Sequence, residues 1–306
     1  MLTGVTRGSY LGSHDSAAIA GDHPFLSKMQ VYLNKLGLTE PREVPERMLW
    51  GTRMQEVILQ AFAERTGLEV EPERFIRHEK LNWFGGTPDG TIKNQRRGVE
   101  AKNIRFADPQ QWGDEGTDQV ARYVLWQCHH LMTLLDYEAW DVAVLFGGAE
   151  LRIYTVERDK ELSDMIVDMD QRFWTDHVMA QVPPEIDGSP AAKAYLDRTY
   201  KTHSDQIRKA TPEEQQVMAD YKAALSEMEK WEVRGKMLEN RIRAAIGNDM
   251  GLTSDLGKIT WKEQAGARRL DTKALKEAHP EIAEQFTRAG DPQRVFRKQF
   301  FEKEQE

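Results

Sequence analysis

Cysteine and long apolar runs are scarce in this sequence of 306 residues. Cys128 is the single cysteine, which excludes an intramolecular disulfide, a cysteine-based zinc site and a protein-held iron–sulfur cluster. One cysteine also fits a reducing compartment, so we expect a cytoplasmic protein. Residues 1–21 lack a basic stretch followed by a long apolar run, and we expect no signal peptide. The longest apolar stretches, such as 142–146, are far too short to span a bilayer, so we expect no membrane partner.

A net positive charge is also missing. The chain has 42 Lys and Arg residues against 50 Asp and Glu residues, and its formal charge is −8. This balance excludes a generally basic nucleic-acid-binding coat, because such a protein would need a surplus of cations over most of its surface. Any DNA-binding surface must therefore gather its Lys and Arg residues on one side. The composition, with 40% hydrophobic and 30% charged residues, is that of a globular protein with one large or two ordinary domains.

Two kinds of periodicity alternate along the first 190 residues. Apolar residues recur at helical spacing in four segments. These expected helices cover 25–36, 46–66, 119–135 and 161–181. Short alternating or apolar runs between them predict strands. The expected strands include 69–71, 75–78, 91–93, 98–102, 140–146 and 151–156. Strands interleaved with helices predict an α/β fold, with a mixed central sheet flanked by helices.

A proline-rich segment, 182–190, is the best candidate for a domain boundary. We therefore expect a core domain over residues 1–190 and an α+β accessory region over residues 191–306. From Val217 to Ala245 an apolar or small residue recurs alternately every four and three positions. This spacing predicts a long helix whose narrow stripe packs against another helix, in the same chain or in an oligomer. A strand at 258–262, a helix at 272–289 and a strand at 295–301 are expected after it.

The residues with the strongest chemical signal are Asp89 and the sequence Glu100-Ala101-Lys102. Asp89 follows a turn, and the two paired strands after it place Glu100 and Lys102 on one face of a hairpin. Two carboxylates, with waters and a backbone carbonyl, suit Mg²⁺ better than zinc. Mg²⁺ would activate a water for attack on a phosphate, and Lys102 would orient that water or hold a phosphate oxygen. A solvated hairpin with a surface salt bridge explains the bare pattern equally well.

Several residues elsewhere add to this pattern. Glu56 lies inside an otherwise apolar helical stretch, where an inward-facing carboxylate needs a partner such as a metal; the alternative is a Glu on the helix surface. Gln127 lies near the apolar face of its helix, as a ligand of water or phosphate or as a satisfied buried amide. Arg7 and the turn with Ser13 and His14 precede an apolar run and form a candidate phosphate site, although ordinary helix capping by the turn is common.

These motifs, taken in order, resemble the YqaJ-type viral recombinase family, relatives of lambda exonuclease within the PD-(D/E)xK nuclease superfamily. The resemblance covers about the first 190 residues. The segments that carry it are Trp50-Gly51-Thr52 with Glu56, Thr87-Pro88-Asp89-Gly90, Gly98-Val99-Glu100-Ala101-Lys102, Gln127 to Met132, and Phe173-Trp174 with Val182-Pro183-Pro184 and Asp187-Gly188. The resemblance implies a PD-(D/E)xK nuclease core with an accessory region after it.

The resemblance also implies the role of each site residue. Asp89 and Glu100 look like metal ligands, with the carbonyl of Ala101 as a further ligand, and Lys102 looks like the catalytic lysine. Two more residues are carried over by position, Glu56 as the upstream acid near a second metal and Gln127 as the glutamine of the active-site helix.

The N-terminal segment matches the family less closely. Relatives hold the 5′-phosphate with an Arg and a Ser. Arg7 matches the Arg, whereas His14 stands at the Ser position and Ser13 lies just before it. A protonated His14 would still bind phosphate, and its alternative is an ordinary surface histidine.

The activity implied by the resemblance is a Mg²⁺-dependent exonuclease, with Mn²⁺ as a substitute metal. It would degrade one strand of linear double-stranded DNA from its end, 5′ to 3′, and expose single strand for recombination by annealing. The implied partners are DNA ends, further copies of the chain in a homo-oligomer such as a ring, and a single-strand annealing protein, in a bacterial or phage-infected cell. Two alternatives remain: an endonuclease of the same fold, of the restriction or junction-resolving type, and a non-catalytic recombination scaffold.

Overall fold

The computed structural model describes residues 7–39, 45–72, 74–106, 108, 110–265, 270–288 and 294–300. The chain divides into two compact units, Met1–Thr199 and Tyr200–Glu306. The helix that follows the proline-rich segment 182–190, α6 (Pro190–Thr199), is included in the first unit. Each unit is described by itself below. No described helix has both the length and the apolar character needed to cross a membrane.

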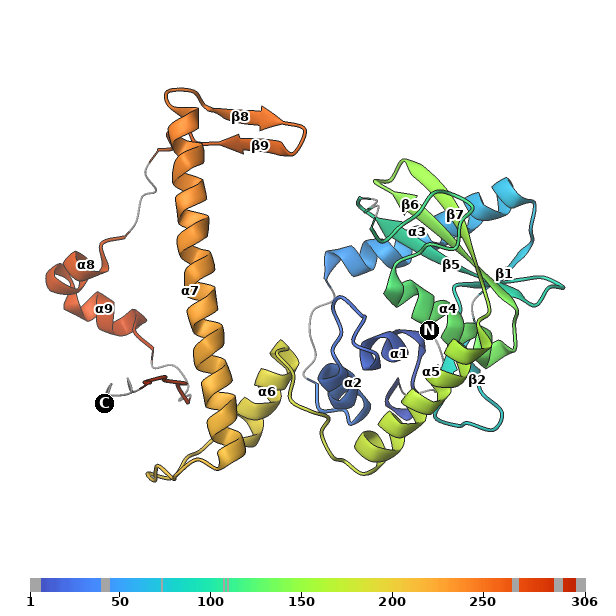
Figure 1. The fold of residues 1–306 in the computed structure, drawn as a ribbon, viewed down its shortest axis with the longest axis horizontal. Helices are drawn as coiled ribbons and strands as arrows, with labels where there is room; N and C mark the ends of the chain where they lie inside the picture. Colours follow the sequence, from blue (N-terminus) through green and yellow to red (C-terminus); the bar gives the residue numbers. More distant parts are fainter. Residues whose placement is uncertain are drawn as a thin grey trace. The chain divides into compact units, whose positions relative to one another are not determined.

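The first unit is built on a five-stranded sheet (Figure 1). Its strands, in spatial order, are β1 (Val70–Pro72), β4 (Gly90–Ile92), β5 (Arg97–Ile104), β6 (Ala139–Phe146) and β7 (Glu150–Glu157). The central strands β5 and β6 run parallel, and the other neighbouring pairs run antiparallel. A mixed sheet between helices confirms the predicted α/β fold.

The parallel pair β5 and β6 needs a crossover connection, because a tight turn can only join antiparallel strands. The helix α4 (Arg122–Leu135) lies in this connection and covers one face of the sheet. Gly98 in β5 faces Trp140 in β6, and a Cβ at Gly98 would lie 2.3 Å from the Trp140 ring. Glycine is therefore required at this position, because any side chain would overlap the buried indole.

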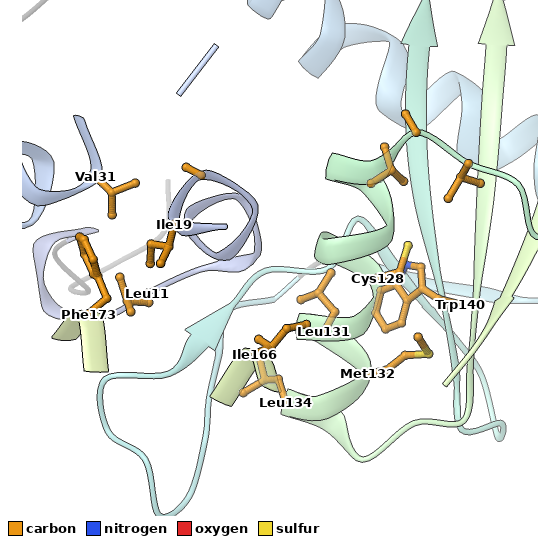
Figure 2. Packing of buried hydrophobic residues seen from close by; sticks show 14 of the residues in the cluster. Leu11, Ile19, Val31, Cys128, Leu131, Met132, Leu134, Trp140, Ile166 and Phe173 are labelled. Atoms are coloured by element: carbon orange, nitrogen blue, oxygen red, sulfur yellow. The ribbon is translucent and has the colours of Figure 1, made fainter. Parts of the chain in front are cut away.

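The two faces of the sheet carry two separate apolar cores. On one face, α3 (Glu46–Thr66) packs through Ile58 and Phe62 against Val99 of β5 and Ala143 of β6. On the other face, α4 and the N-terminal helices form the larger core. This core includes Leu11, Ile19, Cys128, Leu131, Met132, Trp140, Ile166 and Phe173 (Figure 2). The alternation of side chains along β5 thus separates an α3 face from an α4 face.

The remaining elements of the first unit surround the α4 face. They are η1 (Arg7–Ser9), α1 (Ser13–Ile19), α2 (Lys28–Lys35), the short pair β2 (Ile76–Arg77) and β3 (Gly85–Gly86), α5 (Lys160–Phe173) and the π-helical turn η2 (Trp174–Met179). Asp159 caps α5 by accepting the backbone N–H groups of Glu161 and Leu162. The helix predicted over 161–181 is α-helical only to Phe173, because the chain continues from there as the π-helical turn η2.

The second unit begins with α7 (Pro212–Ile246), which confirms the predicted long helix. Thr211 and Glu214 form a capping box at its start. A hairpin of β8 (Gly251–Ser254) and β9 (Gly257–Thr260) follows, and then the short helices α8 (Thr272–Ala278) and α9 (Pro280–Phe286).

The prediction of a strand, one helix and a second strand after α7 is wrong in two respects. The helix is split in two at Pro280, since proline lacks the N–H that a continuous helix requires. The second strand, expected over 295–301, does not form within the described residues 294–300. Here Phe296 and Phe300 lie beside Tyr221 of α7, with ring centroids 6.1 and 6.3 Å away, so these aromatic residues pack on a helix and not in a sheet.

Candidate active site

Glu100 and Lys102 lie two residues apart on β5, so both side chains point to the α4 face. Glu100 is only 5% exposed. The Nζ atom of Lys102 donates to Oε1 of Glu100 at 2.5 Å and to Oε1 of Gln127 at 2.9 Å. Gln127 is fully buried on α4. The structure therefore brings three of the predicted site residues into direct contact, from a strand and from the helix that covers it.

Asp89 joins the same group through the backbone. It lies directly before β4, which pairs with β5 at Gly98 and Val99. Across the hairpin of β4 and β5, Oδ2 of Asp89 accepts the N–H of Ala101 at 2.8 Å. Because the N–H and C=O groups of one strand residue point to the same edge, the Ala101 carbonyl also lies on the Asp89 side of β5. The two carboxylates and this carbonyl thus flank one edge of the strand.

The hydrogen bonds extend from Gln127 to the N-terminal segment. Since Oε1 of Gln127 accepts from the Lys102 ammonium, its Nε2 group is the donor to Nδ1 of His14, at 2.6 Å. His14 therefore accepts this hydrogen bond at Nδ1. The structure places His14 beside the site as a hydrogen-bond partner of Gln127, and its phosphate-binding role stays a prediction.

Burial and charge act in opposite directions on Lys102. Burial alone would lower the pKa of its ammonium, but the carboxylates of Glu100 and Asp89 outweigh this effect, and the pKa is raised. Lys102 consequently stays protonated at neutral pH. The same charges also shift the pKa values of two neighbouring side chains, His23 and Tyr123. Burial, and then Lys102, lower the pKa of His23, and burial raises the pKa of Tyr123, with a smaller contribution from Glu100.

Glu56 is placed differently from the prediction. Its side chain is exposed on α3, and α3 packs through Ile58 on the face of the sheet opposite to Glu100 and Lys102. The expectation that Glu56 faces inward is wrong, because it precedes Ile58 by two residues, which is about 200° around an α-helix. Some of the apolar residues next to Glu56 are also on the surface, since Val57 is 53% exposed.

The two other residues predicted to bind the 5′-phosphate are Arg7 and Ser13. Ser13 is the first residue of α1 and is half-buried next to His14. The backbone of Arg7 begins η1, but its side chain lies outside the described part of the structure. The phosphate-binding role of both residues stays a prediction.

Ser16, His130 and Asp170 form a buried polar cluster that the sequence does not predict. Oγ of Ser16 on α1 donates to Oδ2 of Asp170 on α5 at 2.5 Å and lies 2.7 Å from Nδ1 of His130 on α4. Nε2 of His130 lies 3.0 Å from the carbonyl oxygen of Gly85, four residues before Asp89. All three side chains are 0% exposed, so Ser16 is not placed to attack a substrate. The cluster ties α1, α4, α5 and β3 together.

No local signal identifies this cluster, because its members are 114 and 154 residues apart in the sequence. In the sequence, Ser16 is one polar residue near the start of a helix, and His130 is one of two adjacent histidines. The burial of His130 and its contact with the Gly85 carbonyl are those of a structural residue.

The donor atoms at the β5 edge suit a hard cation. Mg²⁺ is typically bound by one or two carboxylates together with several waters, and Asp89, Glu100 and the Ala101 carbonyl offer oxygen ligands of this kind. Among the described residues, no three His, Cys, Asp or Glu side chains lie together as a metal-binding group. Asp89, Glu100 and the Ala101 carbonyl would leave the remaining coordination positions of such a cation to water.

Comparison with known proteins shows what the first unit is similar to. Residues 5–138 match the model of the YqaJ-like viral recombinase domain. The chain is also similar to the uncharacterized protein YqaJ of Bacillus subtilis (strain 168), with 26% identity over 286 residues that cover 92% of this chain and 88% of that protein. The resemblance inferred from the sequence motifs is thus confirmed, and the matched residues 5–138 include Asp89, Glu100, Lys102 and Gln127.

Solved structures with some similarity include three exonucleases. An alkaline exonuclease (LHK-Exo) from Laribacter hongkongensis has 15% identity and a TM-score of 0.45, over 64% of this chain and 95% of that chain. A putative exonuclease from Eubacterium rectale has 12% identity and a TM-score of 0.44, over 66% and 91%. A phage related exonuclease from Haemophilus somnus 129PT has 14% identity and a TM-score of 0.40, over 56% and 96%.

Proposed function

We propose that this protein is a Mg²⁺-dependent exonuclease that degrades one strand of linear double-stranded DNA from its end, 5′ to 3′. The single-stranded product would serve recombination by annealing. One observation carries the proposal: a half-buried ammonium, Lys102, is held between Glu100 and Gln127, on the strand whose edge Asp89 approaches. This combination of acids and a lysine suits phosphodiester hydrolysis, and it lies within a recombinase-family domain.

The acids would hold the metal. Asp89, Glu100 and the Ala101 carbonyl would provide the protein ligands of Mg²⁺, and Mn²⁺ would substitute for it. When bound, Mg²⁺ would offset the negative charge of the scissile phosphate and ease deprotonation of the attacking water. Glu56, which is exposed on the helix at the opposite face of the sheet, is not part of this proposed metal site.

Lys102 contributes charge rather than basicity. Because the carboxylates beside it raise its pKa, it would act as a cation that orients the attacking water and stabilises negative charge on a phosphate oxygen. Oε1 of Gln127 accepts a hydrogen bond from the ammonium group and so fixes the direction of the Lys102 side chain. Its amide N–H group, which donates to His14, links this arrangement to the segment proposed to meet the DNA end.

The polarity of the reaction rests on that N-terminal segment. Arg7, Ser13 and His14 are proposed to hold the 5′-phosphate of the strand that is degraded. Arg7→Ala should then reduce the preference for 5′-phosphorylated over 5′-hydroxyl ends, without changing the rate on 5′-hydroxyl ends. An unchanged preference would remove Arg7 from the site.

The decisive experiment compares linear duplexes labelled at the 5′ or the 3′ end, with Mg²⁺ or with EDTA. We expect early release of the 5′ label as a mononucleotide, late release of the 3′ label, and no release in EDTA. Early release of the 3′ label would reverse the polarity. Hydrolysis that persists in EDTA would contradict the metal requirement.

Covalently closed circular DNA separates the alternatives. We expect circles to remain intact under conditions that degrade the linear form. Cleavage of circles would favour an endonuclease of the same fold. If neither form is hydrolysed, and Asp89→Ala leaves recombination in cells unchanged, the protein is a scaffold. We also propose that the protein forms a homo-oligomer and binds a single-strand annealing protein. Binding experiments, rather than the nuclease assays above, test these two parts.

A further inference from the structure

The helix α7 exposes an apolar stripe along its length. The helix has 35 residues and is therefore about 52 Å long, yet Ile246 is its only buried residue. The stripe is formed by Val217, Tyr221, Ala224, Met228, Trp231, Gly235, Leu238, Ile242 and Ala245. Its larger members are open to solvent, with Met228 67% and Trp231 63% exposed. A regular stripe of this kind is typical of a helix that packs against another helix.

The stripe follows the heptad pattern in which core positions a and d recur at spacings of three and four. Tyr221, Met228, Gly235 and Ile242 take position a, and the other five take position d. The g position, next to a, then holds four charged residues in a simple order. Asp220 and Glu227 are negative in the first half, and Arg234 and Arg241 are positive in the second half.

We propose that α7 pairs with α7 of a second copy of this chain in an antiparallel coiled coil. Placing Met228 opposite Trp231 of the second copy sets the register, because position a faces position d in an antiparallel pair. The same register puts Tyr221 opposite Leu238 and Val217 opposite Ile242. It also places Ala224 opposite Gly235, so that the two small residues meet in one layer where the backbones approach.

The charges agree with this register. In an antiparallel pair, g positions face g positions, so Asp220 meets Arg241 and Glu227 meets Arg234 of the second copy. Each contact occurs twice by symmetry, so all four g pairs combine opposite charges. The acids at position e, Glu232 and Glu239, already pair within their own helix, with Lys236 at 2.6 Å and Arg243 at 2.5 Å, and would face apolar e residues of the second copy.

A parallel pair would fit these charges poorly. In that arrangement, position g faces position e of the next heptad. Glu227 would then meet Glu232 of the second copy, which is repulsive, and Arg241 would meet the apolar Ile246. Arg234 with Glu239 would be the one favourable combination along these heptads. The sign order along α7 therefore selects the antiparallel direction.

Among the described residues of the second unit, contacts within the chain leave the centre of the stripe open. Phe296 and Phe300 lie beside Tyr221, which remains 38% exposed, and Arg234 lies over the Trp231 ring, 5.2 Å from its centroid. These contacts touch the stripe without covering Met228 or the outer face of Trp231. The second copy would cover the same layers from the other side.

Two charge-reversal variants of the full chain test the proposal. The acidic variant combines Arg234→Glu with Arg241→Glu, and the basic variant combines Asp220→Lys with Glu227→Lys. Each variant alone should weaken self-association at least about tenfold by sedimentation equilibrium, because all g pairs become repulsive. An equimolar mixture should recover the wild-type association, because every g pair again combines opposite charges. The substituted positions are exposed, and circular dichroism should show unchanged helix content.

The direction of the helices has a separate readout. A mixture of a Val217→Cys variant and an Ile242→Cys variant should be joined by a short bis-maleimide, whereas Val217→Cys alone should not. The native Cys128 is buried and does not compete for the reagent. Wild-type protein that stays monomeric at tens of micromolar, mass unaffected by either charge reversal, or a mixture that fails to re-associate would each overturn the proposal. Stronger association of the basic variant would show a parallel pair instead.

Discussion

The ammonium of Lys102 lies 2.5 Å from the carboxylate of Glu100, although the two side chains are only 13% and 7% exposed. Their separation by two residues on β5 forces them onto one face of the sheet, and α4 covers that face. Each charge is therefore the main compensation for the other in a place where water is largely excluded. The pair is both a structural requirement of the site and the basis of its proposed chemistry.

Replacing Lys102 by Met should abolish hydrolysis and also destabilise the fold. The substitution leaves Glu100 buried without its cation, which costs about 3–5 kcal/mol when a buried pair is broken. Urea unfolding of the full chain measures the loss.

The double variant Lys102→Met with Glu100→Gln is the matched control. Removing both charges should recover a large part of the stability, since no uncompensated charge remains, while activity stays absent. The single variant Glu100→Gln completes the comparison. If the losses in unfolding free energy of Lys102→Met and Glu100→Gln add up to the loss of the double variant, the two side chains do not interact in solution.

Asp89→Asn should abolish activity with little effect on stability. The amide oxygen still accepts the Ala101 N–H, so the free energy of unfolding should change by less than about 1 kcal/mol, while the negative charge that would bind Mg²⁺ is lost. Activity is measured on linear duplex over a range of Mg²⁺ concentrations. Near wild-type rates at saturating Mg²⁺ would contradict the metal-binding role.

Gln127→Leu tests whether Gln127 positions Lys102. The change removes the contacts to both Lys102 and His14, and we expect kcat to fall about tenfold to a hundredfold with little change in KM. His14→Ala removes only the second contact and serves as the control for it. A larger effect of His14→Ala than of Gln127→Leu would show that His14, and not the orientation of Lys102, limits the reaction.

The buried cluster of Ser16, His130 and Asp170 predicts a pH dependence of stability. Burial raises the pKa of Asp170 above its unfolded value of about 3.9. The stabilisation from this group is therefore complete below about pH 4 and is lost as pH rises through the folded pKa. Asp170→Asn removes this titration, so the stability of the wild type relative to the variant should fall as pH rises above about 4. Parallel stability curves would contradict the assignment.

Asp170→Ala should cost more than Asp170→Asn at every pH. Alanine leaves the Ser16 hydroxyl without its acceptor in the core, at a cost of about 1–3 kcal/mol, whereas asparagine keeps an oxygen in place. Because the cluster holds the β3 backbone ahead of Asp89, we also expect Asp170→Ala to lower kcat.

Local sequence patterns predict much of the fold. The helical spacing that ends at Gly67 gives α3 with its bounds, because Gly67 adopts the left-handed conformation that closes the helix. The alternating strands on either side of the turn at 94–97 pair as β4 and β5. The split of α8 from α9 is less well predicted, since the pattern of apolar residues continues across Pro280 although its backbone cannot continue a helix.

The amino-acid sequence by itself determined which chemistry is available here: an acid before one strand, an acid and a lysine two apart on the next, and a glutamine on the crossover helix. Strand alternation alone sets Glu100 and Lys102 side by side. Only the tertiary structure decided that Gln127 and His14 reach this pair, that Glu56 lies on the opposite face, and that Ser16, His130 and Asp170 meet in the core. These outcomes depend on how helices dock against the two faces of the sheet, and that packing joins residues more than 100 positions apart.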